Sequence, residues 1–401
     1  MFETLIHILL GIVFFYCAAS VCYLFVFALA SKFYKRKKGV PATPAQRIAV
    51  LVPAYAEDGI ILSTAESLLR LDYPAELYDV YIIADSFQPQ TLERLRQLPV
   101  HLLEVSFEKS TKTKSLNEAF RRISQPYDIA LICDADNILA RNFLQKINTA
   151  FANGAKAVQG RRVAKNLDTP FAILDACSEG INNNIFRKGA NALGLSSAVI
   201  GSGMAFPFER IREILASIKA VGGFDKILQL QVVAEGHSIQ YLEDAIIFDE
   251  KVDSAQAFHQ QRRRWVSSQF LYLKQFFAPA MQQLLKGNGS YFNLAIANNL
   301  VLPRAFLFIL LPLLLVAGWI VGTGWGIGTT LLCGLYLLTL VLALPSELVN
   351  RNFYNALLRL PRAVLLMAGT LFGMKKANKT FIHTVHTKTE INNPLFKEHA
   401  Q

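Results

Sequence analysis

One uninterrupted apolar run, residues 5–30, constrains this chain more than any other part of its sequence. About 20 apolar residues are enough for a helix to cross a bilayer, and this run is longer. It is followed directly by basic residues: Lys32, Lys35, Arg36, Lys37 and Lys38. Because basic residues beside a membrane span stay on the cytosolic side, we expect residues 1–31 to form an uncleaved anchor with its N-terminus outside and the next domain in the cytosol.

The composition also favours membrane segments. Of the 401 residues, 52% are hydrophobic and only 18% are charged, and the mean hydropathy is +0.30. The net charge of +11 comes largely from clusters of bases next to apolar runs, where bases set topology and bind anionic lipid. No nucleic-acid motif accompanies this charge, so we expect no nucleic-acid partner. We expect an integral protein of the plasma (inner) membrane.

The cysteine pattern indicates a reducing compartment for the soluble part. The chain has five cysteines, and none of them forms a C-x-x-C pair: Cys17, Cys22, Cys133, Cys177 and Cys333. This pattern predicts neither a disulfide framework nor a zinc site.

Residues 47–133 alternate between strand-like and helix-like patterns. The expected strands are 47–53, 80–84, 100–105 and 128–133, and the expected helices are 60–70, 91–97 and 115–123. Strands alternating with helices predict an α/β domain with a parallel, doubly wound sheet. In such sheets ligands bind at the carboxyl ends of the strands. Pro53, Asp85 and Asp134 all fall at such ends.

The C-terminal part is expected to return to the membrane. Residues 263–285 are amphipathic and predict an interfacial helix, and apolar spans follow at 293–318 and 328–345. Residues 363–374 are apolar but too short to span alone, so we expect an interfacial or re-entrant helix with a cytosolic tail; a further span is the alternative. The expected organisation is an anchor (1–31), a catalytic domain (45–260), an interfacial helix (261–290), two spans (291–346) and a tail (347–401).

Asp134-Ala-Asp136 follows the last expected strand. Two carboxylates one residue apart at a strand end can turn toward one ligand, and hard oxygen ligands suit Mg²⁺ or Mn²⁺. The alternative is a solvated turn after the strand.

Other polar residues lie at helix or strand ends. Asp85 could accept a hydrogen bond from a base or a ribose, or cap a helix. Lys112, with Lys114 and Asn117, begins a helix where a phosphate could dock; a solvated helix start is the alternative. Asp225 lies eleven residues before Gly236, at the start of a helix, and could act as a general base. The alternative is a carboxylate in the first helical turn that the helix dipole stabilises. His383 and His386 lack an evident third ligand, so we expect no metal there.

The last candidate cluster is Gln261-Arg-Arg-Arg-Trp265. An amide, a guanidinium and an indole face suit a diphosphate next to a sugar ring, and the residues that offer them are Gln261, Arg264 and Trp265. Arg262 and Arg263 are candidates for lipid contact, because an amphipathic segment follows at once.

In order, these motifs resemble the membrane-bound branch of the family 2 glycosyltransferases, which includes cellulose, chitin and hyaluronan synthases. The resemblance covers roughly residues 47–270. It rests on Val52-Pro-Ala-Tyr-Ala-Glu57, Ala84-Asp85, Lys112-Thr-Lys-Ser-Leu-Asn117, Asp134-Ala-Asp136, Phe224-Asp225 and Gln261-Arg-Arg-Arg-Trp265.

This resemblance implies a GT-A fold (the Rossmann-like fold of nucleotide-diphospho-sugar transferases), a UDP-sugar or similar donor, a Mg²⁺ or Mn²⁺ ion, and inversion at the anomeric carbon. The residues implied to hold the nucleoside are Ala54, Tyr55, Glu57 and Asp85. Lys112 would lie near the ribose or phosphate, and Asp134 and Asp136 would position the cation and donor. Asp225 would be the catalytic base. The groups implied to bind the diphosphate and the acceptor sugar are Gln261, Arg264 and Trp265.

The sequence departs from the family pattern at three positions. Ala56 replaces the usual Asn, and Ala84 replaces the first Asp of the usual pair, so base recognition rests on Asp85. Phe224 replaces the usual Glu before the base, which leaves Glu243 and Asp244 as alternative bases.

Three functions remain open for such a chain. The first is sugar transfer to a growing polysaccharide or glycan, with membrane lipids and export or assembly subunits as further partners. The second is transfer of a single sugar to a lipid-linked acceptor. The third is a catalytically silent membrane scaffold.

Overall fold

The computed structural model describes residues 2–35, 45–218, 223–252, 255–369 and 386–394. Within helices, the side chains of 255–268, 270, 363 and 366–369 also lie outside the description. The chain divides into two compact units. A helical unit comprises residues 1–35, 169–195 and 253–377, and a sheet unit comprises 36–168, 196–252 and 378–401. The sheet unit is therefore discontinuous in sequence, and residues 169–195, expected within the catalytic domain, belong to the helical unit.

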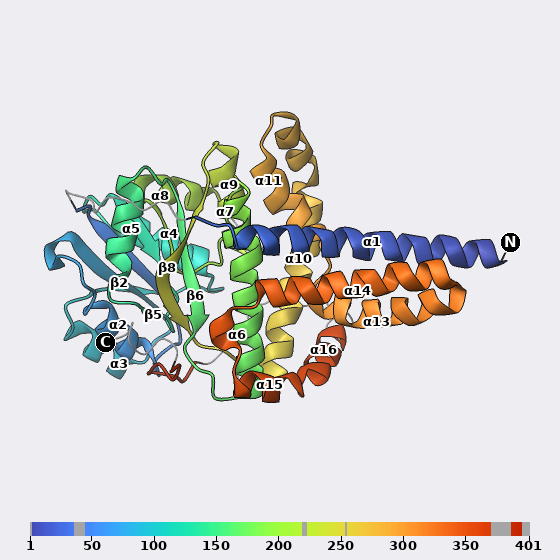
Figure 1. The fold of residues 1–401 in the computed structure, drawn as a ribbon. Coiled ribbons are helices and arrows are strands. Elements are labelled where there is room, and N and C mark those ends of the chain that lie inside the picture. Colours follow the sequence, from blue (N-terminus) through green and yellow to red (C-terminus); the bar gives the residue numbers. More distant parts are fainter. Residues whose placement is uncertain (1, 36–44, 219–222, 253–254, 370–385, 395–401) are drawn as a thin grey trace. The chain divides into compact units, whose positions relative to one another are not determined.

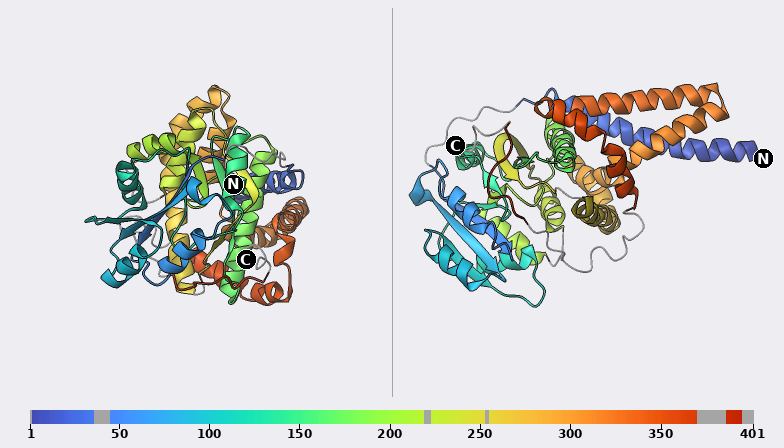
Figure 2. Two further views of the ribbon diagram at one scale, coloured as in Figure 1. Left: turned by 90° about the vertical axis from the view of Figure 1, so that its left-hand side faces the viewer. Right: turned by 90° about the horizontal axis from the view of Figure 1, so that it is seen from below.

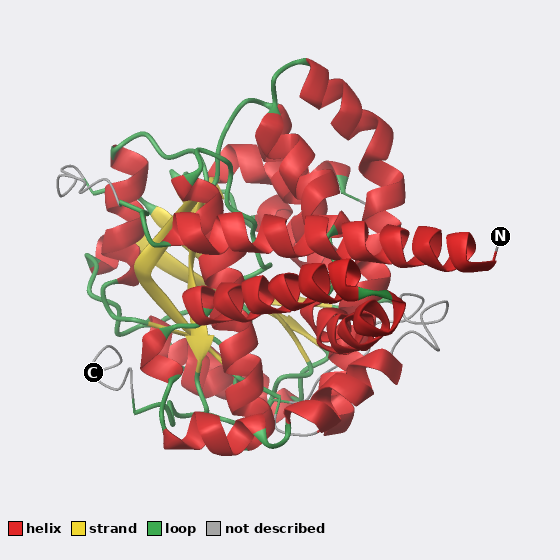
Figure 3. Cartoon of the chain, turned by 45° about the vertical axis from the view of Figure 1, so that its right-hand side comes forward, coloured by secondary structure: helices red, strands yellow, loops and turns green. Residues whose placement is uncertain are grey.

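The sheet unit is built on one eight-stranded sheet of described residues, with strands drawn yellow in Figure 3. Its strand order is β3-β2-β1-β4-β7-β6-β8-β5. The strands are β1 (Ile48–Tyr55), β2 (Tyr78–Asp85), β3 (His101–Val105), β4 (Ile129–Ile132), β5 (Ile138–Leu139), β6 (Val158–Ala164), β7 (Met204–Pro207) and β8 (Gln240–Asp249).

The expected parallel arrangement describes only half of this sheet. Strands β3, β2, β1 and β4 are parallel to their neighbours, as the alternating pattern predicted. However, β7 is antiparallel to both β4 and β6, and β5 is antiparallel to β8. The expectation of a purely parallel sheet was wrong, because β7 and β5 join the sheet as antiparallel strands.

Helices cover the sheet, whose strands alternate their side chains between two faces. The helices of this unit are α2 (Ile61–Leu68), α3 (Pro89–Arg96), α4 (Lys112–Arg122), α5 (Phe143–Ala152), α8 (Phe208–Ser217), α9 (Phe224–Ala234) and the 3-10 turn Ala75–Leu77. One large core cluster joins alternate residues of β1, β2 and β4 with apolar residues of α2, α3 and α5. Helices α4 and α8 pack together and contact β1 and β4 respectively. The site described below lies where these strands end.

The helical unit contains three helices that are long and apolar enough to cross a membrane, among the residues that the structure describes. They are α1 (Phe2–Ser31), α13 (Arg304–Val321) and α14 (Thr323–Ala343). These helices run side by side in Figures 1 and 2, and they share one buried apolar cluster. Many of their other side chains are exposed, including Phe15, Ile320 and Val341.

The other elements of this unit are shorter or amphipathic. They are α6 (Pro170–Asn182), the π-helix Asn183–Gly189, α7 (Ala190–Ala192), α10 (Ala255–Leu285), α11 (Gly289–Phe292), the π-helix Asn293–Ala297, α12 (Asn298–Leu300), the 3-10 turn Ser346–Leu348, α15 (Arg351–Leu357) and α16 (Leu360–Gly369).

The apolar segments differ in detail from the expected ones. Residues 293–318 do not form one helix, because the chain leaves the helix at Val301 and α13 begins only after Pro303. A single residue, Gly322, separates α13 from α14, whereas the expected spans ended at 318 and began again at 328. The short apolar segment near the C-terminus is helical in α16 as far as Gly369, and its continuation lies outside the described residues.

Candidate active site

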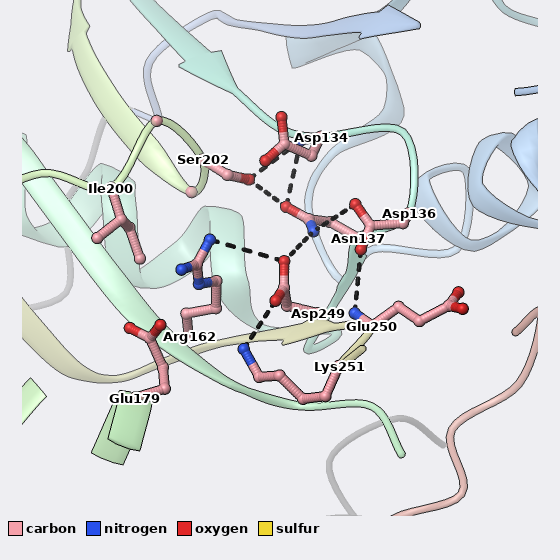
Figure 4. A network of polar contacts seen from close by, with 12 residues as sticks. Asp134, Asp136, Asn137, Arg162, Glu179, Ile200, Ser202, Asp249, Glu250 and Lys251 are labelled. Atoms are coloured by element: carbon pink, nitrogen blue, oxygen red, sulfur yellow. Dashed lines mark hydrogen bonds and ion pairs between the residues drawn. The ribbon is translucent and has the colours of Figure 1, made fainter. Parts of the chain in front are cut away.

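Three carboxylates meet at one edge of the sheet. Asp134 and Asp136 follow β4, Asp249 ends β8, and one oxygen atom of each lies within 4.8 Å of the others (Figure 4). Strands β4 and β8 are not neighbours in the sheet. The chain after Asp136 nevertheless runs directly into β5, whose Ile138 pairs with Phe248 of β8. This short antiparallel pairing places Asp249 beside the predicted aspartate pair.

Asn137, which the sequence reasoning did not single out, bonds to the carboxylates of Asp136 and Asp249 and to the backbone of Asp134. It is fully buried, and its Oδ1 accepts from the backbone N–H of Asp134 at 3.2 Å. Its Nδ2 donates to Asp136 Oδ1 at 3.2 Å and to Asp249 Oδ1 at 3.3 Å. The hydroxyl of Ser202 also contacts Asn137 and accepts from the backbone N–H of Asp134 at 3.0 Å. One buried amide therefore orients two of the three carboxylates and holds the backbone of the third residue (Figure 4).

The charge of this cluster suits a cation. Asp136 is 4% exposed, and burial, followed by the negative charges of Asp249 and Asp134, raises its pKa to about 6, against the opposing effect of His386 and Lys165. Lys251 Nζ lies 2.8 Å from Asp249, and Arg162 lies 3.7 Å from it. Despite these cations, the three carboxylates still repel one another. Three oxygen donors at one point fit a hard divalent ion such as Mg²⁺ or Mn²⁺.

The raised pKa of Asp136 predicts a pH-dependent stability. Because its folded pKa lies above the ordinary value of 3.8, this carboxyl contributes stability below about pH 4 that is lost as pH rises through about 6. We expect the Tm of the metal-free protein to fall over this range, and to fall less, by a few degrees, in Asp136→Asn. Thermal unfolding in detergent checks this, and equal falls in the two proteins would contradict it.

Lys112 connects the carboxylates with the next functional group. It begins α4, whose N-terminus is capped by Thr111 Oγ1 accepting from Lys114 N at 3.2 Å. Its Nζ forms a short ion pair with Asp134 and donates to the carbonyl of Gly201 at 2.7 Å. The same nitrogen lies 5.7 Å from the centre of the Phe224 ring. The predicted phosphate-binding lysine thus lies beside the predicted metal ligands.

Asp225 lies near Gly201. It is in the first turn of α9, as the sequence predicted, and a Cβ added at Gly201 would lie 3.9 Å from its side chain. Gly201 has a φ of 81°, which favours glycine. Burial raises the pKa of the Asp225 carboxyl, against the charges of Lys226 and Lys112. A partly buried carboxylate with a raised pKa, close to a cation and a metal-ligand set, is suited to accept a proton.

A second set of predicted residues lies where β1 and β2 end. Ala54 is buried, Tyr55 is half-buried at the end of β1, and Glu57 is 8% exposed. Ala56 adopts a φ of 51°, and its N–H donates to the carbonyl of Asp85 at 2.9 Å, which ties the two strand ends together.

Asp85 carries an unsatisfied acceptor. The residue is 1% exposed, and its Oδ1 accepts from the Ser86 hydroxyl at 3.0 Å. Its buried Oδ2 has no hydrogen-bond partner among the described residues. Because an unpaired buried carboxylate oxygen costs free energy, this atom is a good acceptor for an N–H group of a ligand.

The alternative bases lie elsewhere. Glu243 and Asp244 are in the middle of β8, and Asp244 pairs with Lys146 of α5 at 3.0 Å. Asp244 lies five residues before Asp249 in β8. Neither belongs to the carboxylate cluster.

The remaining candidates fall on residues that are only partly described. Helix α10 contains Gln261, Arg264 and Trp265, but their side chains lie outside the described residues, so their role stays a prediction. His383 also lies outside them. His386 is described, and its Nδ1 lies 2.8 Å from Glu57 Oε1. No sequence pattern indicates this contact, because the two residues are 329 positions apart.

Comparison with known proteins connects this geometry to a family. A family model described as "Glycosyltransferase like family 2" matches residues 44–268. The "Probable glycosyltransferase YdaM" of Bacillus subtilis is 24% identical over 255 residues, 58% of this chain and 58% of that protein. A beta-monoglucosyldiacylglycerol synthase of Synechocystis is 24% identical over 236 residues, 55% of this chain and 47% of that protein. The chain spans about half the length of the curated relatives it matches.

Among solved structures, the mannosyltransferase PcManGT from Pyrobaculum calidifontis, in complex with GDP-Man and Mn²⁺, superposes with a TM-score of 0.55. The two sequences are 18% identical, and the superposition covers 94% of this chain and 100% of that one. At this identity the likeness establishes a shared fold.

Proposed function

The chain belongs to glycosyltransferase like family 2 and has a GT-A-like nucleotide-sugar transferase fold, and from this premise we propose that it transfers a sugar from a UDP-sugar to an acceptor hydroxyl at a membrane. The observation that carries the proposal is the continuous arrangement of Asp136, Asp134, Lys112, Gly201 and Asp225 at the strand ends. It supports the proposal because candidate residues for a cation site, for phosphate binding and for a general base lie next to one another.

Asp134, Asp136 and Asp249 are the residues that would hold the divalent ion. When bound, Mg²⁺ or Mn²⁺ supplies positive charge that stabilises the departing diphosphate. Asp249 extends the two-residue motif expected from the sequence, and Asn137 keeps the carboxylates of Asp136 and Asp249 oriented. Lys112 adds a second positive charge next to Asp134. Before the donor arrives, the Lys112–Asp134 ion pair neutralises part of the cluster.

The transfer step follows from the position of Asp225. The acceptor oxygen attacks the anomeric carbon from the face opposite the diphosphate, the carbon–oxygen bond to the diphosphate breaks, and the nucleoside diphosphate leaves. Asp225 accepts the acceptor's proton, and the attack from the opposite face inverts the configuration at the anomeric carbon. Burial raises the pKa of Asp225, which makes its carboxylate a better proton acceptor near neutral pH. Gln261, Arg264 and Trp265 remain our candidates for binding the diphosphate and the acceptor sugar.

The free oxygen of Asp85 supports a uridine donor. Uracil presents one N–H group at the edge between its two carbonyls, which one acceptor atom can satisfy. Guanine presents an N–H and an amino group side by side, which would need both carboxylate oxygens. Because the Ser86 hydroxyl already donates to Oδ1 of Asp85, Oδ2 is the carboxylate oxygen that has no partner among the described residues, and one such oxygen matches the single N–H of uracil.

We therefore predict that a donor panel separates UDP-sugars from GDP-sugars. With the purified chain and Mn²⁺, the best UDP-sugar should exceed the GDP-sugar with the same sugar by about tenfold to hundredfold in kcat/KM, because an unpaired buried donor costs about 1–3 kcal/mol. Asp85→Asn should reduce this preference. A GDP-sugar used equally well would contradict the uridine assignment, and no turnover with any donor would favour a silent scaffold.

The acceptor is the less constrained half of the reaction. We propose a growing polysaccharide or glycan, in keeping with the Gln261, Arg264 and Trp265 pattern. Single transfer to a lipid acceptor is the second candidate, because curated relatives from Synechocystis and two other cyanobacterial sources are named as synthases of a glucosyl diacylglycerol. Product length with a labelled donor distinguishes the two, since a ladder of products requires repeated addition.

The helices support action at a membrane. Three apolar helices and the bases after α1 fit an integral plasma-membrane protein with the sheet unit in the cytosol, where UDP-sugars are made available. Export or assembly subunits are the partners that a polymer product would require.

A further inference from the structure

The last described residues, 386–394, belong to the sheet unit although they are more than 130 positions from its preceding part. We call this segment the C-terminal strap. Its distal half is fixed to the end of β6. Asn392 N donates to the carbonyl of Lys165 at 2.8 Å, and Asn393 Nδ2 donates to the carbonyl of Ala164 at 2.7 Å. Asn393 is 1% exposed, so the strap is packed into the fold at this point.

The proximal half of the strap is tied to the carboxylate cluster. The backbone N–H groups of Thr387 and Lys388 donate to the carboxylate of Glu250 at 3.1 Å and 2.9 Å. Glu250 follows Asp249 directly, and its own N–H donates to Asp136 Oδ2 at 3.0 Å. The strap backbone is therefore connected through one residue, Glu250, to two of the three proposed metal ligands, Asp249 and Asp136.

A buried lysine adds a third attachment. Lys165 is 1% exposed, and its Nζ donates to the carbonyl of Lys388 at 2.8 Å. Burial lowers its pKa, against the opposing effect of several carboxylates that include Asp136 and Glu250. A buried ammonium that lost its carbonyl acceptor would be costly, so Lys165 favours the strap in its observed position.

These attachments bring His386 to the proposed nucleoside side of the site. Its Nδ1 lies 2.8 Å from Glu57 Oε1, and the two side chains are 24% and 9% exposed. Burial lowers the pKa of His386, but the hydrogen bond to Glu57 and the charges of Asp136, Glu57 and Glu250 together raise it to about 9. The imidazole is thus a hydrogen-bond donor to Glu57. Its Nε2 has no hydrogen-bond partner among the described residues.

We propose that His386 is a positioning residue of the donor site, and that through it the C-terminal strap fixes the Glu57 carboxylate for the nucleoside diphosphate. This inference rests on the proposed function, and on the family resemblance, which implies that Glu57 helps to hold the nucleoside. A carboxylate already held in one orientation loses less conformational freedom when a ligand binds, so the contact contributes to affinity. Ser63 of α2, which donates to the carbonyl of Thr389 at 2.9 Å, holds the strap against the helix that follows Glu57.

The test is UDP binding to the full-length protein in detergent with Mn²⁺, measured by calorimetry. We expect His386→Ala and His386→Phe each to weaken UDP binding about tenfold, because a hydrogen bond to a charged group is lost. His386→Gln, which keeps a donor, should stay within about threefold of the wild type. The matched control is Glu390→Gln, an exposed position on the same strap, which should bind UDP as the wild type does.

A double-variant cycle with Glu57→Gln separates positioning from general stabilisation. In the Glu57→Gln background, His386→Ala should change UDP affinity by less than about twofold, because its partner is already altered. Additive losses, or wild-type affinity in His386→Ala, would overturn the strap's role while leaving the proposed function intact. A wild-type protein that binds UDP in no condition would overturn both.

Discussion

Replacing Asp136 by asparagine should abolish sugar transfer while leaving the protein folded. Asp136 is the most buried of the three clustered carboxylates, and it also accepts from Asn137 and from the backbone N–H of Glu250. A bound metal contributes several kcal/mol of charge stabilisation. Since each 1.4 kcal/mol is a factor of ten, kcat/KM should fall by at least about 10³-fold. The measurement is release of the nucleoside diphosphate with the best donor from the panel.

The matched control is Asp72→Asn, which removes an exposed carboxylate that pairs with Arg141 at the surface. Surface pairs of this kind contribute about 0–1 kcal/mol, so this variant should keep its activity. Asp136→Asn should also lose the rise in Tm that Mn²⁺ gives the wild type, although its metal-free form is the more stable near neutral pH. An active Asp136→Asn protein would remove Asp136 from the metal site.

Replacing Asp225 by asparagine should leave donor binding intact and remove the proton acceptor. General base catalysis contributes about 10²–10⁴-fold, so we expect kcat to fall within that range. The affinity for UDP with Mn²⁺ should change by less than about twofold, because Asp225 lies near Gly201 and is not one of the three clustered carboxylates. Single-turnover kinetics with saturating donor separate the chemical step from binding.

Two further variants decide between the candidate bases. Asp244→Asn and Glu243→Gln should keep the wild-type kcat, because both residues lie in the middle of β8 and Asp244 already pairs with Lys146. If Asp225→Asn keeps its activity while Asp244→Asn loses it, the base lies on β8 and the proposed direction of attack is wrong.

The parts of the site that the sequence predicted are those placed by local structure. Asp134 and Asp136 were found because a strand pattern stops just before them, and a side chain at the end of a buried strand is positioned by that strand. Asp85 was likewise found at the end of a strand pattern, β2. Asp225 was found at the start of a helix pattern, in the first turn of α9. Each of these positions depends on a few neighbouring residues.

The parts that the sequence did not predict depend on long-range pairing. Asp249 joins the cluster only because two residues of β5 pair with β8, and such a short strand carries almost no periodic signal. Asn137 acts through contacts to residues on two other segments. The antiparallel entry of β7 likewise follows from tertiary packing, not from the local pattern. His386 was considered only as a metal ligand, because its partner Glu57 lies near the other end of the chain.

The return of residues 386–394 has a practical consequence for dissecting the protein. A catalytic fragment cut from the sequence as residues 45–252 would contain every strand of the sheet and both predicted aspartates, yet it would leave Lys165 and Glu250 facing water where Lys388 and Thr387 now contact them. Such a fragment lacks one segment of the domain that it is meant to represent. Joining 386–394 to it by a short linker restores what the natural chain supplies through its helical unit.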